Sequence, residues 1–398
     1  MSKPLSYYAF YVNDRVDSNT LTTHNYVGVD NMIPNKGGVV DSEYVPNEGT
    51  STAIKKGDIL IGNIRPYFKK IWLATFDGGC SPDVLCIRSN GRMIPECLFA
   101  TLSQDTFFKY NMAGSKGSKM PRGDKDHIMS FPIPELKNQD SIGVFITNLN
   151  KKIIINNKIN VELESMAKTL YDYWFLQFEF PNEDGKPYKS SGGKMVQNEK
   201  LKREIPKGWK VQELLDLVKW ESNSQPPKSE FIYNQEPGYI RFIQNRDYDS
   251  NNYITYIPFT KNLAVVDEFD ILIDKYGDAG ATRFGIAGAF NVALGKIHTL
   301  FPNTKEYIRS FLSCDSIYNF LHNSCMASTR ASLSEKNLSH IHIAIPPDWL
   351  LEKYEKITHD LRKKILLNKK ENNEISSVRD FLLPLLMNGQ VAFKLETE

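Results

Sequence analysis

The sequence predicts an α+β protein built as a pseudo-two-fold internal repeat. In it, two globular α/β-mixed domains are separated by two long antiparallel helices that form a coiled coil. Three observations predict this architecture. Short apolar runs rich in β-branched residues recur in the two halves at a nearly constant offset. A long segment with a seven-residue apolar repeat closes each half. A stretch rich in Gly, Ser, Lys and Glu joins the halves.

The repeat is clearest in two pairs of matching segments. Residues 58–61, Asp-Ile-Leu-Ile, recur 212 residues later at 270–273, and each run is short and apolar enough to be a buried strand. Residues 114–134 and 327–347 form the second pair, which aligns His127 with His340 and ends in a proline-bounded strand. Because the matches keep one order and nearly one offset, duplication explains them better than chance.

Two long helices are predicted at residues 142–177 and 348–387, each about 50–60 Å long. Asp348 is the expected N-cap of the second helix, which ends before Asn388-Gly389, and the first helix ends before Pro181. We expect Pro384 to kink or end the second helix. The predicted seam of the first helix is Leu149, Ile153, Asn156, Asn160, Leu163, Ala167, Leu170 and Trp174; that of the second is Leu361, Ile365, Asn368, Asn372, Ile375, Arg379, Leu382 and Leu386.

Each seam carries two asparagines at its middle. A buried asparagine costs a coiled coil stability but fixes its register and partner. We expect the helices to pack antiparallel about a local two-fold axis, with Asn156 near Asn372 and Asn160 near Asn368. The alternative is that these asparagines face water.

These elements divide the chain into five parts. The first domain is residues 1–140, the first long helix 141–180, an exposed linker 181–205, the second domain 206–347, and the second long helix with a tail 348–398. Residues 205–209, Ile-Pro-Lys-Gly-Trp, open the second domain, and we expect Trp209 to anchor it. The first half has no such opening, so the sequence does not define where the first domain starts.

Composition excludes several classes of protein. The formal net charge is +2, with 41% hydrophobic and 24% charged residues, which is ordinary for a globular protein and unlike a polycation. No apolar run reaches the roughly 18 residues of a membrane helix, and the N-terminus lacks the pattern of a signal peptide. The five cysteines include no Cys-x-x-Cys pair. We therefore expect a reduced, cytoplasmic location and no zinc site.

Catalytic motifs are missing from the sequence. We find no phosphate-binding loop, no dinucleotide-binding glycine motif, no Asn/Asp-Pro-Pro-Tyr/Phe methyltransferase motif and no His-Glu-x-x-His pair. His127 and His340 are expected to be structural histidines rather than acids or bases. We predict no catalytic residue and no metal ligand in this chain.

Basic, aromatic and small polar residues concentrate in a few loops. Arg, Lys and hydroxyl side chains hold phosphates, whereas Asn, Gln and Arg read base edges. We also expect Gly114, Gly117 and Gly123 to let the backbone approach a phosphate. The alternative for each segment is a solvated loop. The candidate DNA-binding residues are Arg65, Lys69, Lys70, Lys116, Ser118, Lys119, Arg122 and Lys125 in the first half, and Arg241, Gln244, Asn245, Arg246, Lys275, Tyr276, Thr329, Arg330 and Ser332 in the second.

Several longer stretches together resemble the specificity subunit of type I restriction–modification systems. The resemblance spans nearly the whole chain. The stretches are residues 57–72 (GDILIGNIRPYFKKIW), 117–125 (GSKMPRGDK), 166–181 (MAKTLYDYWFLQFEFP), 185–195 (GKPYKSSGGKM), 203–209 (REIPKGW) and 270–297 (DILIDKYGDAGATRFGIAGAFNVALGKI).

This resemblance implies a non-catalytic subunit that recognises DNA. In that family, two target-recognition domains each read one half of an asymmetric bipartite sequence, and two antiparallel helices set the spacing. The implied partners are double-stranded DNA, two methyltransferase subunits and two restriction subunits that are translocating nucleases, without a membrane. S-adenosylmethionine, ATP and Mg are implied for those partner subunits, and no cofactor is expected on this chain.

The resemblance also implies roles for particular residues. In residues 63–72, we expect Ile64, Tyr67, Phe68 and Trp72 to pack, while Arg65, Lys69 and Lys70 face phosphates. Asn245 and Arg246 are expected near bases. The aromatic run that ends the first helix would form an exposed apolar patch for a methyltransferase partner, or would instead pack against its own domain. The candidate docking residues are Tyr171, Tyr173, Trp174 and Phe175.

Three alternatives remain. The chain is the specificity subunit of a related methylation-based phage-defence system, or a coiled-coil scaffold that joins proteins without reading DNA, or an enzyme with degenerate nuclease or methyltransferase motifs. The two halves diverge between their shared strands, so under the DNA-reading hypothesis we expect an asymmetric target.

Overall fold

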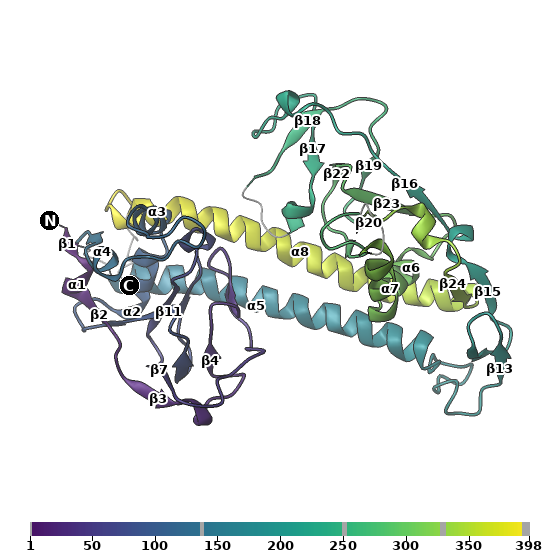
Figure 1. The fold of residues 1–398 in the computed structure, drawn as a ribbon, viewed down its shortest axis with the longest axis horizontal. Helices are drawn as coiled ribbons and strands as arrows, with labels where there is room; N and C mark the ends of the chain where they lie inside the picture. The colour runs from purple at the N-terminus through teal and green to yellow at the C-terminus, as the bar shows by residue number, and fades with distance from the viewer. Residues whose placement is uncertain (1, 136–138, 249–252, 327–331, 392–398) are drawn as a thin grey trace, which may run out of the picture. The chain divides into compact units, whose positions relative to one another are not determined.

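The computed structural model describes residues 2–135, 139–248, 253–326 and 332–391, and its fold is mixed α/β (Figure 1). It contains two compact units. Unit 1 comprises Met1–Ile159 and Asn368–Glu398, and unit 2 comprises Asn160–Leu367. In the part of the chain that the structure describes, no helix is long and apolar enough to span a membrane.

The first sheet of unit 1 is antiparallel and is built around the predicted Asp-Ile-Leu-Ile strand, which is confirmed. All four residues of β8 are buried, as the apolar run requires. Asp58 starts the strand, and both its carboxylate oxygens accept hydrogen bonds from Arg88 on the neighbouring β11. The order is β2-β11-β8-β9, from Ala9–Tyr11, Val84–Ser89, Ile59–Gly62 and Ile71–Leu73.

A second four-stranded sheet of unit 1 has the order β3-β7-β10-β4. The pair β10 and β4 is parallel, and the other pairs are antiparallel. The strands are Arg15–Asp17, Thr50–Ile54, Gly78–Cys80 and Tyr26–Val27. Two further pairs are β1 with β12, Lys3–Pro4 and Pro132–Ile133, and β5 with β6, Met32–Ile33 and Gly38–Val39. The helices are α1 Leu5–Tyr8, α2 Pro95–Leu102, α3 Asp105–Ala113 and α4 Lys125–Met129.

Unit 2 repeats this frame. Its first sheet has the order β16-β23-β20-β21, and β20 holds Ile271, Leu272 and Ile273 of the second Asp-Ile-Leu-Ile run. Its second sheet has the order β18-β17-β22-β19 and again contains one parallel pair, β17 with β22. The strands are Val218–Glu221, Leu294–Thr299, Ile271–Asp274 and Thr282–Arg283, then Tyr256–Pro258, Tyr239–Ile243, Gly288–Phe290 and Val265–Val266. The helices are α6 Lys305–Leu312 and α7 Asp315–Met326.

The start of the first domain, which the sequence left undefined, follows from this comparison. In unit 2, β15 (Lys210–Glu213) pairs with β24 (His342–Ile345). In unit 1, β1 pairs in the same antiparallel way with β12, and Ile133 of β12 stands 212 residues before Ile345 of β24. Residues 3–4 therefore take the place that β15 takes in unit 2.

Two long helices contribute a segment to each unit. They are α5, Gln139–Tyr171, which continues into a π-helical turn at Asp172–Leu176, and α8, Asp348–Met387. The α8 bounds are those predicted from the sequence. Pro384 lies inside α8, which runs on for only three more residues to Met387.

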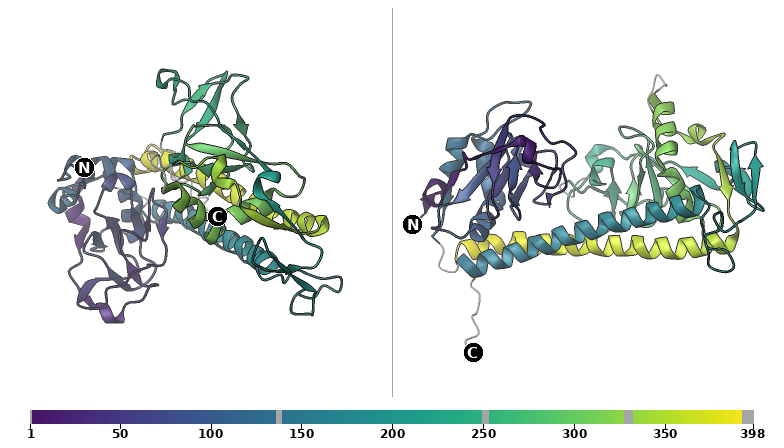
Figure 2. Two further views of the ribbon diagram at one scale, coloured as in Figure 1. Left: turned by 45° about the vertical axis from the view of Figure 1, so that its right-hand side comes forward. Right: turned by 90° about the horizontal axis from the view of Figure 1, so that it is seen from below.

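Within unit 1, the α5 and α8 segments run antiparallel (Figure 2). Asn156 Nδ2 donates to Asn372 Oδ1 at 2.9 Å and to Glu371 Oε2 at 2.7 Å, while Arg379 donates to Asn150 Oδ1 at 2.7 Å. Residue numbers therefore fall along one helix as they rise along the other.

The seam asparagines do not face water. Asn156, Asn160 and Asn368 are buried, and Asn372 is half-buried. Of the apolar seam residues three positions from an asparagine, Ile153 and Ile365 are buried, and Leu163 and Ile375 are half-buried.

Each core is closed by the ends of the long helices. In unit 1, Ile142 and Ile146 of α5 share a core with Leu383 and Leu386 of α8. A Cβ on Gly143 would lie 2.7 Å from the backbone nitrogen of Cys97, so only glycine lets α5 approach α2 this closely.

The aromatic run at the end of α5 is part of the core of unit 2, so of the two alternatives the structure favours packing against its own domain. Tyr171, Trp174 and Phe175 are buried. Phe175 lies edge-on to Tyr354 of α8 and to Tyr307 of α6, with ring centroids 4.8 and 4.7 Å apart. Only Tyr173 among the four candidate docking residues is exposed. Their own domain therefore buries the other three.

The predicted linker is largely exposed and contains one hairpin, β13 (Met195–Asn198) with β14 (Arg203–Pro206). Trp209 beyond it is buried and packs on Phe178 and Phe180 at ring-centroid distances of 5.5 and 5.4 Å. It anchors this end of unit 2, as its place in the sequence predicted.

Replacing Asn156 by Ala should lower the free energy of unfolding by about 1–3 kcal/mol, because Glu371 and Asn372 lose a buried donor. Urea unfolding measures the change. Lys158→Ala, at an exposed position of the same helix, is the control. Equal stability of the two variants would show that the asparagine contact contributes nothing.

Candidate nucleic-acid interface

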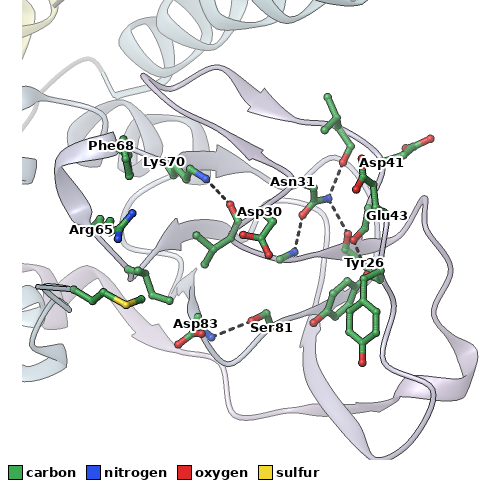
Figure 3. A pocket seen from close by; sticks show the side chains of 17 residues that line it. Tyr26, Asp30, Asn31, Asp41, Glu43, Arg65, Phe68, Lys70, Ser81 and Asp83 are labelled. Carbon is green, nitrogen blue, oxygen red and sulfur yellow. Dashed lines mark hydrogen bonds between the residues drawn. The ribbon is translucent and has the colours of Figure 1, made fainter. Parts of the chain in front are cut away.

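An open groove of about 810 Å³ lies in unit 1 (Figure 3). Three parts of the chain form its walls: residues 26–31, residues 40–44, and the turn that follows β8, with Ser81, Asp83 and Met120 completing the lining. The turn belongs to the basic-aromatic stretch 63–72, so the groove contains candidates that the sequence singled out.

The turn has a fixed backbone. Arg65 and Lys69 both have left-handed backbone conformations, with φ of 53° and 52°, and they flank a 3-10 turn at Pro66–Phe68. Its carbonyl groups accept backbone hydrogen bonds from another loop: Asn35 N–H donates to Phe68 and Lys36 N–H to Lys69. A non-glycine residue in this conformation is uncommon and persists where surrounding contacts hold it.

Lys36 is a buried lysine beneath this turn. Its Nζ lies 3.0 Å from Asp380 of α8 and 3.2 Å from Asp105 of α3, and Lys69 Nζ lies 2.8 Å from the same Asp105. Burial, joined by the charge of Arg379, lowers the pKa of Lys36 despite both carboxylates. This network was not predictable from local patterns, because its members are far apart along the chain.

Tyr67 and Phe68 are exposed, which corrects the expectation that they pack. Their rings lie 4.8 Å apart at the surface, and only Trp72 of the aromatic residues in this stretch is buried. The backbone between them and Trp72 reverses in the left-handed turn, so side chains that follow one another point to different environments.

The basic candidate residues of unit 1 differ in the hydrogen bonds and ion pairs that they already form within the protein. Lys70 Nζ donates to the Val29 carbonyl at 2.6 Å, and burial lowers its pKa, so it supports the groove wall. Lys69 pairs with Asp105, Lys116 with Asp124 and Arg122 with Asp83. Lys119 is exposed, and no ion-pair partner for it lies among the described residues. The remaining candidates are Arg65, half-buried in the groove lining; Ser118, exposed; and Lys125, exposed beside the Tyr11 ring.

The groove also carries carboxylates that the sequence reasoning missed. Asp30, Asp41, Glu43 and Asp83 line it together with Tyr44. Asn31 holds its loop by accepting from Gly28 N–H and donating to the carbonyls of Tyr26 and Val40. Carboxylates accept hydrogen bonds from the amino groups of bases. No spacing or motif in residues 26–44 marks these side chains.

Close packing explains the glycines at positions 114 and 123, whereas their expected role beside a phosphate stays a prediction. A Cβ on Gly114 would lie 2.0 Å from the His127 ring, and one on Gly123 would lie 2.3 Å from Asn111 Oδ1. His127 stacks on Tyr110 with ring centroids 4.1 Å apart, and its Nε2 lies 3.0 Å from the Tyr110 carbonyl. His127 is therefore held as a structural residue, as predicted.

The candidates of unit 2 gather beyond β17. Gln244 N–H donates to Asp247, and its side chain donates to Thr255 Oγ1 at 3.0 Å. Arg246 is exposed beside the Tyr253 ring, 5.7 Å from its centroid. Asn245 is half-buried in the same 3-10 turn, and Arg241 is half-buried on β17. Arg246 Nη2 also donates to the Tyr253 carbonyl at 3.5 Å and to Thr255 Oγ1 at 3.4 Å, so this exposed side chain is held by its neighbours.

A buried acid lies beside this connection. Burial raises the pKa of Asp274, at the end of β20, although Arg283 donates two hydrogen bonds to it at 2.8 and 3.2 Å. Burial likewise raises the pKa of Asp247. These carboxylates hold the backbone and Arg283, so they serve the frame of the connection.

The other candidates of unit 2 are only partly described. Leu333 N–H donates to the Lys275 carbonyl at 3.0 Å, which places half-buried Ser332 near β20 and exposed Tyr276. Thr329 and Arg330 lie outside the described residues. Among the residues that are described, no cluster of three or more His, Cys, Asp or Glu side chains is able to hold a metal ion.

Comparisons with known proteins find a matching domain, similar sequences and a similar fold. Residues 206–377 match the type I restriction modification DNA specificity domain. The chain is 27% identical to the MjaIX specificity subunit of Methanocaldococcus jannaschii over 75% of this chain and 69% of that one. It is 26% identical to the HindI specificity subunit of Haemophilus influenzae over 85% and 87% of the two chains. Its fold resembles the crystal structure of the type I restriction–modification S subunit from M. genitalium, with a TM-score of 0.55, 14% identity and coverage of 97% and 95%.

Replacing Gly114 by Ala should destabilise unit 1 by about 1–3 kcal/mol, because the added methyl group meets the His127 ring. The double variant Gly114→Ala, His127→Ala should be less unstable than the two single costs together, by at least about 0.5 kcal/mol. Thermal or urea unfolding measures this cycle. Additive costs would mean that the ring does not occupy this space.

Acid should weaken the Lys36 network. Burial raises the pKa of Asp380, but its contacts with Arg379 and Lys36 outweigh burial and lower that pKa. A carboxyl whose folded-state pKa is lowered stabilises the fold above its ordinary value, near 4, and loses that contribution as pH falls further. The urea midpoint should therefore fall less between about pH 6 and about pH 3 in Asp380→Asn than in the wild type. Asp360→Asn is the exposed control on the same helix; equal pH dependence in all three proteins would contradict the assignment.

Proposed function

We propose that this chain, which belongs to the family of type I restriction–modification specificity subunits, recognises DNA as two separate half-sites. Each unit would read one half-site, and α5 and α8 would set the gap between them. The chain itself would supply recognition and not catalysis.

The observation that carries this proposal is that the two units share their central strands but differ in an outer strand. The first sheets of the two units have equivalent strand orders, and both second sheets contain one parallel pair. The outer strand differs: β3 lies beside β7 in unit 1, whereas β18 lies beside β17 in unit 2. Two recognition units that share their sheets but differ in their outer strands and loops suit a DNA target whose two halves differ.

The partners follow from the same proposal. Two methyltransferase subunits would dock on the helices and supply S-adenosylmethionine chemistry, and two restriction subunits would supply ATP- and Mg-dependent translocation and cleavage. Exposed apolar residues on the long helices, such as Phe381 and Leu367, are available to such partners. No cofactor is assigned to this chain.

The deciding experiment is to map methylated bases in a host that expresses this chain with its methyltransferase, against a host with the methyltransferase alone. A new two-part motif with a fixed unspecified gap supports the proposal. No new motif, while the same methyltransferase works beside another specificity subunit, would reduce this chain to a scaffold.

A residue that contacts a base and a residue that contacts a phosphate should lose DNA binding in different ways when replaced by Ala. Arg246→Ala should cost about 1–3 kcal/mol of binding free energy on the cognate site and relax one position of one half-site, because Arg reads base edges.

Lys119→Ala should weaken binding to all sequences alike and lower the slope of the salt dependence by about one, because it would remove one phosphate contact.

Fluorescence anisotropy on a set of single-base target variants, repeated at several salt concentrations, separates the two effects. Lys158→Ala, an exposed lysine on α5, is the matched control for loss of charge. A sequence-independent loss in Arg246→Ala would reassign that residue to phosphate contact. An unchanged salt slope in Lys119→Ala would remove that residue from the interface.

A further inference from the structure

A second pocket, separate from the groove, lies in unit 2 where the end of α5 meets the start of α8. Its volume is about 390 Å³. We name it the aromatic pocket. Its ring walls are Phe180, Tyr188, Trp209 and Trp349; Pro206 and Pro347 lie between them, and Glu183 and Asp184 are on its rim.

The rings of the aromatic pocket are already packed on one another within this chain. Phe180 stacks between Tyr188 and Trp209, with centroid distances of 4.6 and 5.4 Å and interplanar angles of 17° and 29°. Trp349 stands edge-on to Phe180 at 6.4 Å. Trp209 is buried at the base of the pocket, while Trp349 is 50% exposed. A large aromatic side chain in the first turn of α8 is thus left open to solvent beside an organised stack.

Acceptors surround this wall. Glu183 and Asp184 are exposed on a turn that Asn182 fixes, since Asn182 Oδ1 accepts the backbone N–H groups of Asp184 and Lys186 at 3.0 and 2.9 Å. The one basic side chain in the lining is Lys207. Two carboxylates against one ammonium leave the pocket acidic.

The neighbouring ring already holds a cation. The Arg203 guanidinium lies 5.0 Å from the centroid of Phe178, which packs on the other side of Trp209. Aromatic faces attract cations through their quadrupole, and nearby carboxylates add charge attraction. The pocket offers the same chemistry, since half-exposed Trp349 lines it together with the carboxylates of Glu183 and Asp184.

We propose that the aromatic pocket receives an arginine or lysine side chain presented by the methyltransferase subunit. This inference rests on the proposed function, because it names the chemistry by which that partner docks. The side chain would lie against Trp349 and Tyr188, with its charged group at Glu183 and Asp184. An acidic rim would repel the phosphates of DNA, so a protein cation is the occupant that fits.

The test measures the affinity of the purified full-length chain for its purified methyltransferase subunit by isothermal titration calorimetry. Trp349→Ala should weaken binding by about tenfold or more, and Trp349→Phe, which keeps a ring, should recover most of it. The double variant Glu183→Gln, Asp184→Asn should weaken binding several-fold and reduce its salt dependence. Tyr233→Ala, at another exposed aromatic residue of unit 2, should bind as the wild type does.

The outcomes separate this inference from the proposed function. If the wild type does not bind the methyltransferase at all, the proposed function fails. If the wild type binds and Trp349→Ala binds equally well, the pocket is not a docking site. If Trp349→Ala weakens binding while the charge variant does not, the occupant is an apolar or proline-rich segment, and the assignment of a cation is wrong. Circular dichroism of each variant confirms that unit 2 remains folded.

Discussion

The closing of each core by both long helices is the constraint on which the rest of the structure depends. Unit 1 buries Leu383, Leu386 and Met387 of α8 beside Ile142 and Ile146 of α5. Unit 2 buries the end of α5 beside Leu350, Leu351 and Tyr354 at the start of α8. Unit 2 is one continuous stretch of chain, Asn160–Leu367, whereas unit 1 combines two distant parts of the sequence. Unit 1 needs residues that lie more than 200 positions later in the sequence. The long helices are therefore part of both hydrophobic cores, which a simple spacer helix would not need to be.

Local patterns in the sequence were enough to predict the frame. The apolar Asp-Ile-Leu-Ile runs became the central strands β8 and β20, because four buried positions in succession need apolar residues on both faces. The bounds of α8 followed from Asp348 and Asn388-Gly389, which are end signals that act within one turn. In the second sheets, β4 and β19 have only two residues each, too few to show a period of two. The second sheet of each unit was therefore not predictable strand by strand.

The candidate sites were predictable in their location but not in their contacts. Residues 63–72 do border a groove, yet the left-handed turn at Arg65 and Lys69 decides which side chains are buried, and nothing in the local composition specifies that turn. Lys36 and Asp380 meet only through the fold. The aromatic run is different. Tyr171, Trp174, Phe175 and Phe178 follow helical spacing, and they are the members that became buried. The helical period therefore distinguishes these buried residues from Tyr173 and Leu176, which are exposed.

The unlike outer strands explain how one frame can support two recognition surfaces. In unit 1, β4 is the edge of the second sheet, and Tyr26, Gly28 and Val29 at that edge line the groove. In unit 2, the equivalent position on β17 is covered by β18, and the connection between those strands carries Gln244, Asn245 and Arg246. The central strands are thus equivalent in the two units, while the same edge borders a groove lined by carboxylates, Arg65 and Lys70 in unit 1 and carries an arginine-bearing connection in unit 2. Under the proposed function, these different surfaces would contact different base edges, which suits a target with unlike halves.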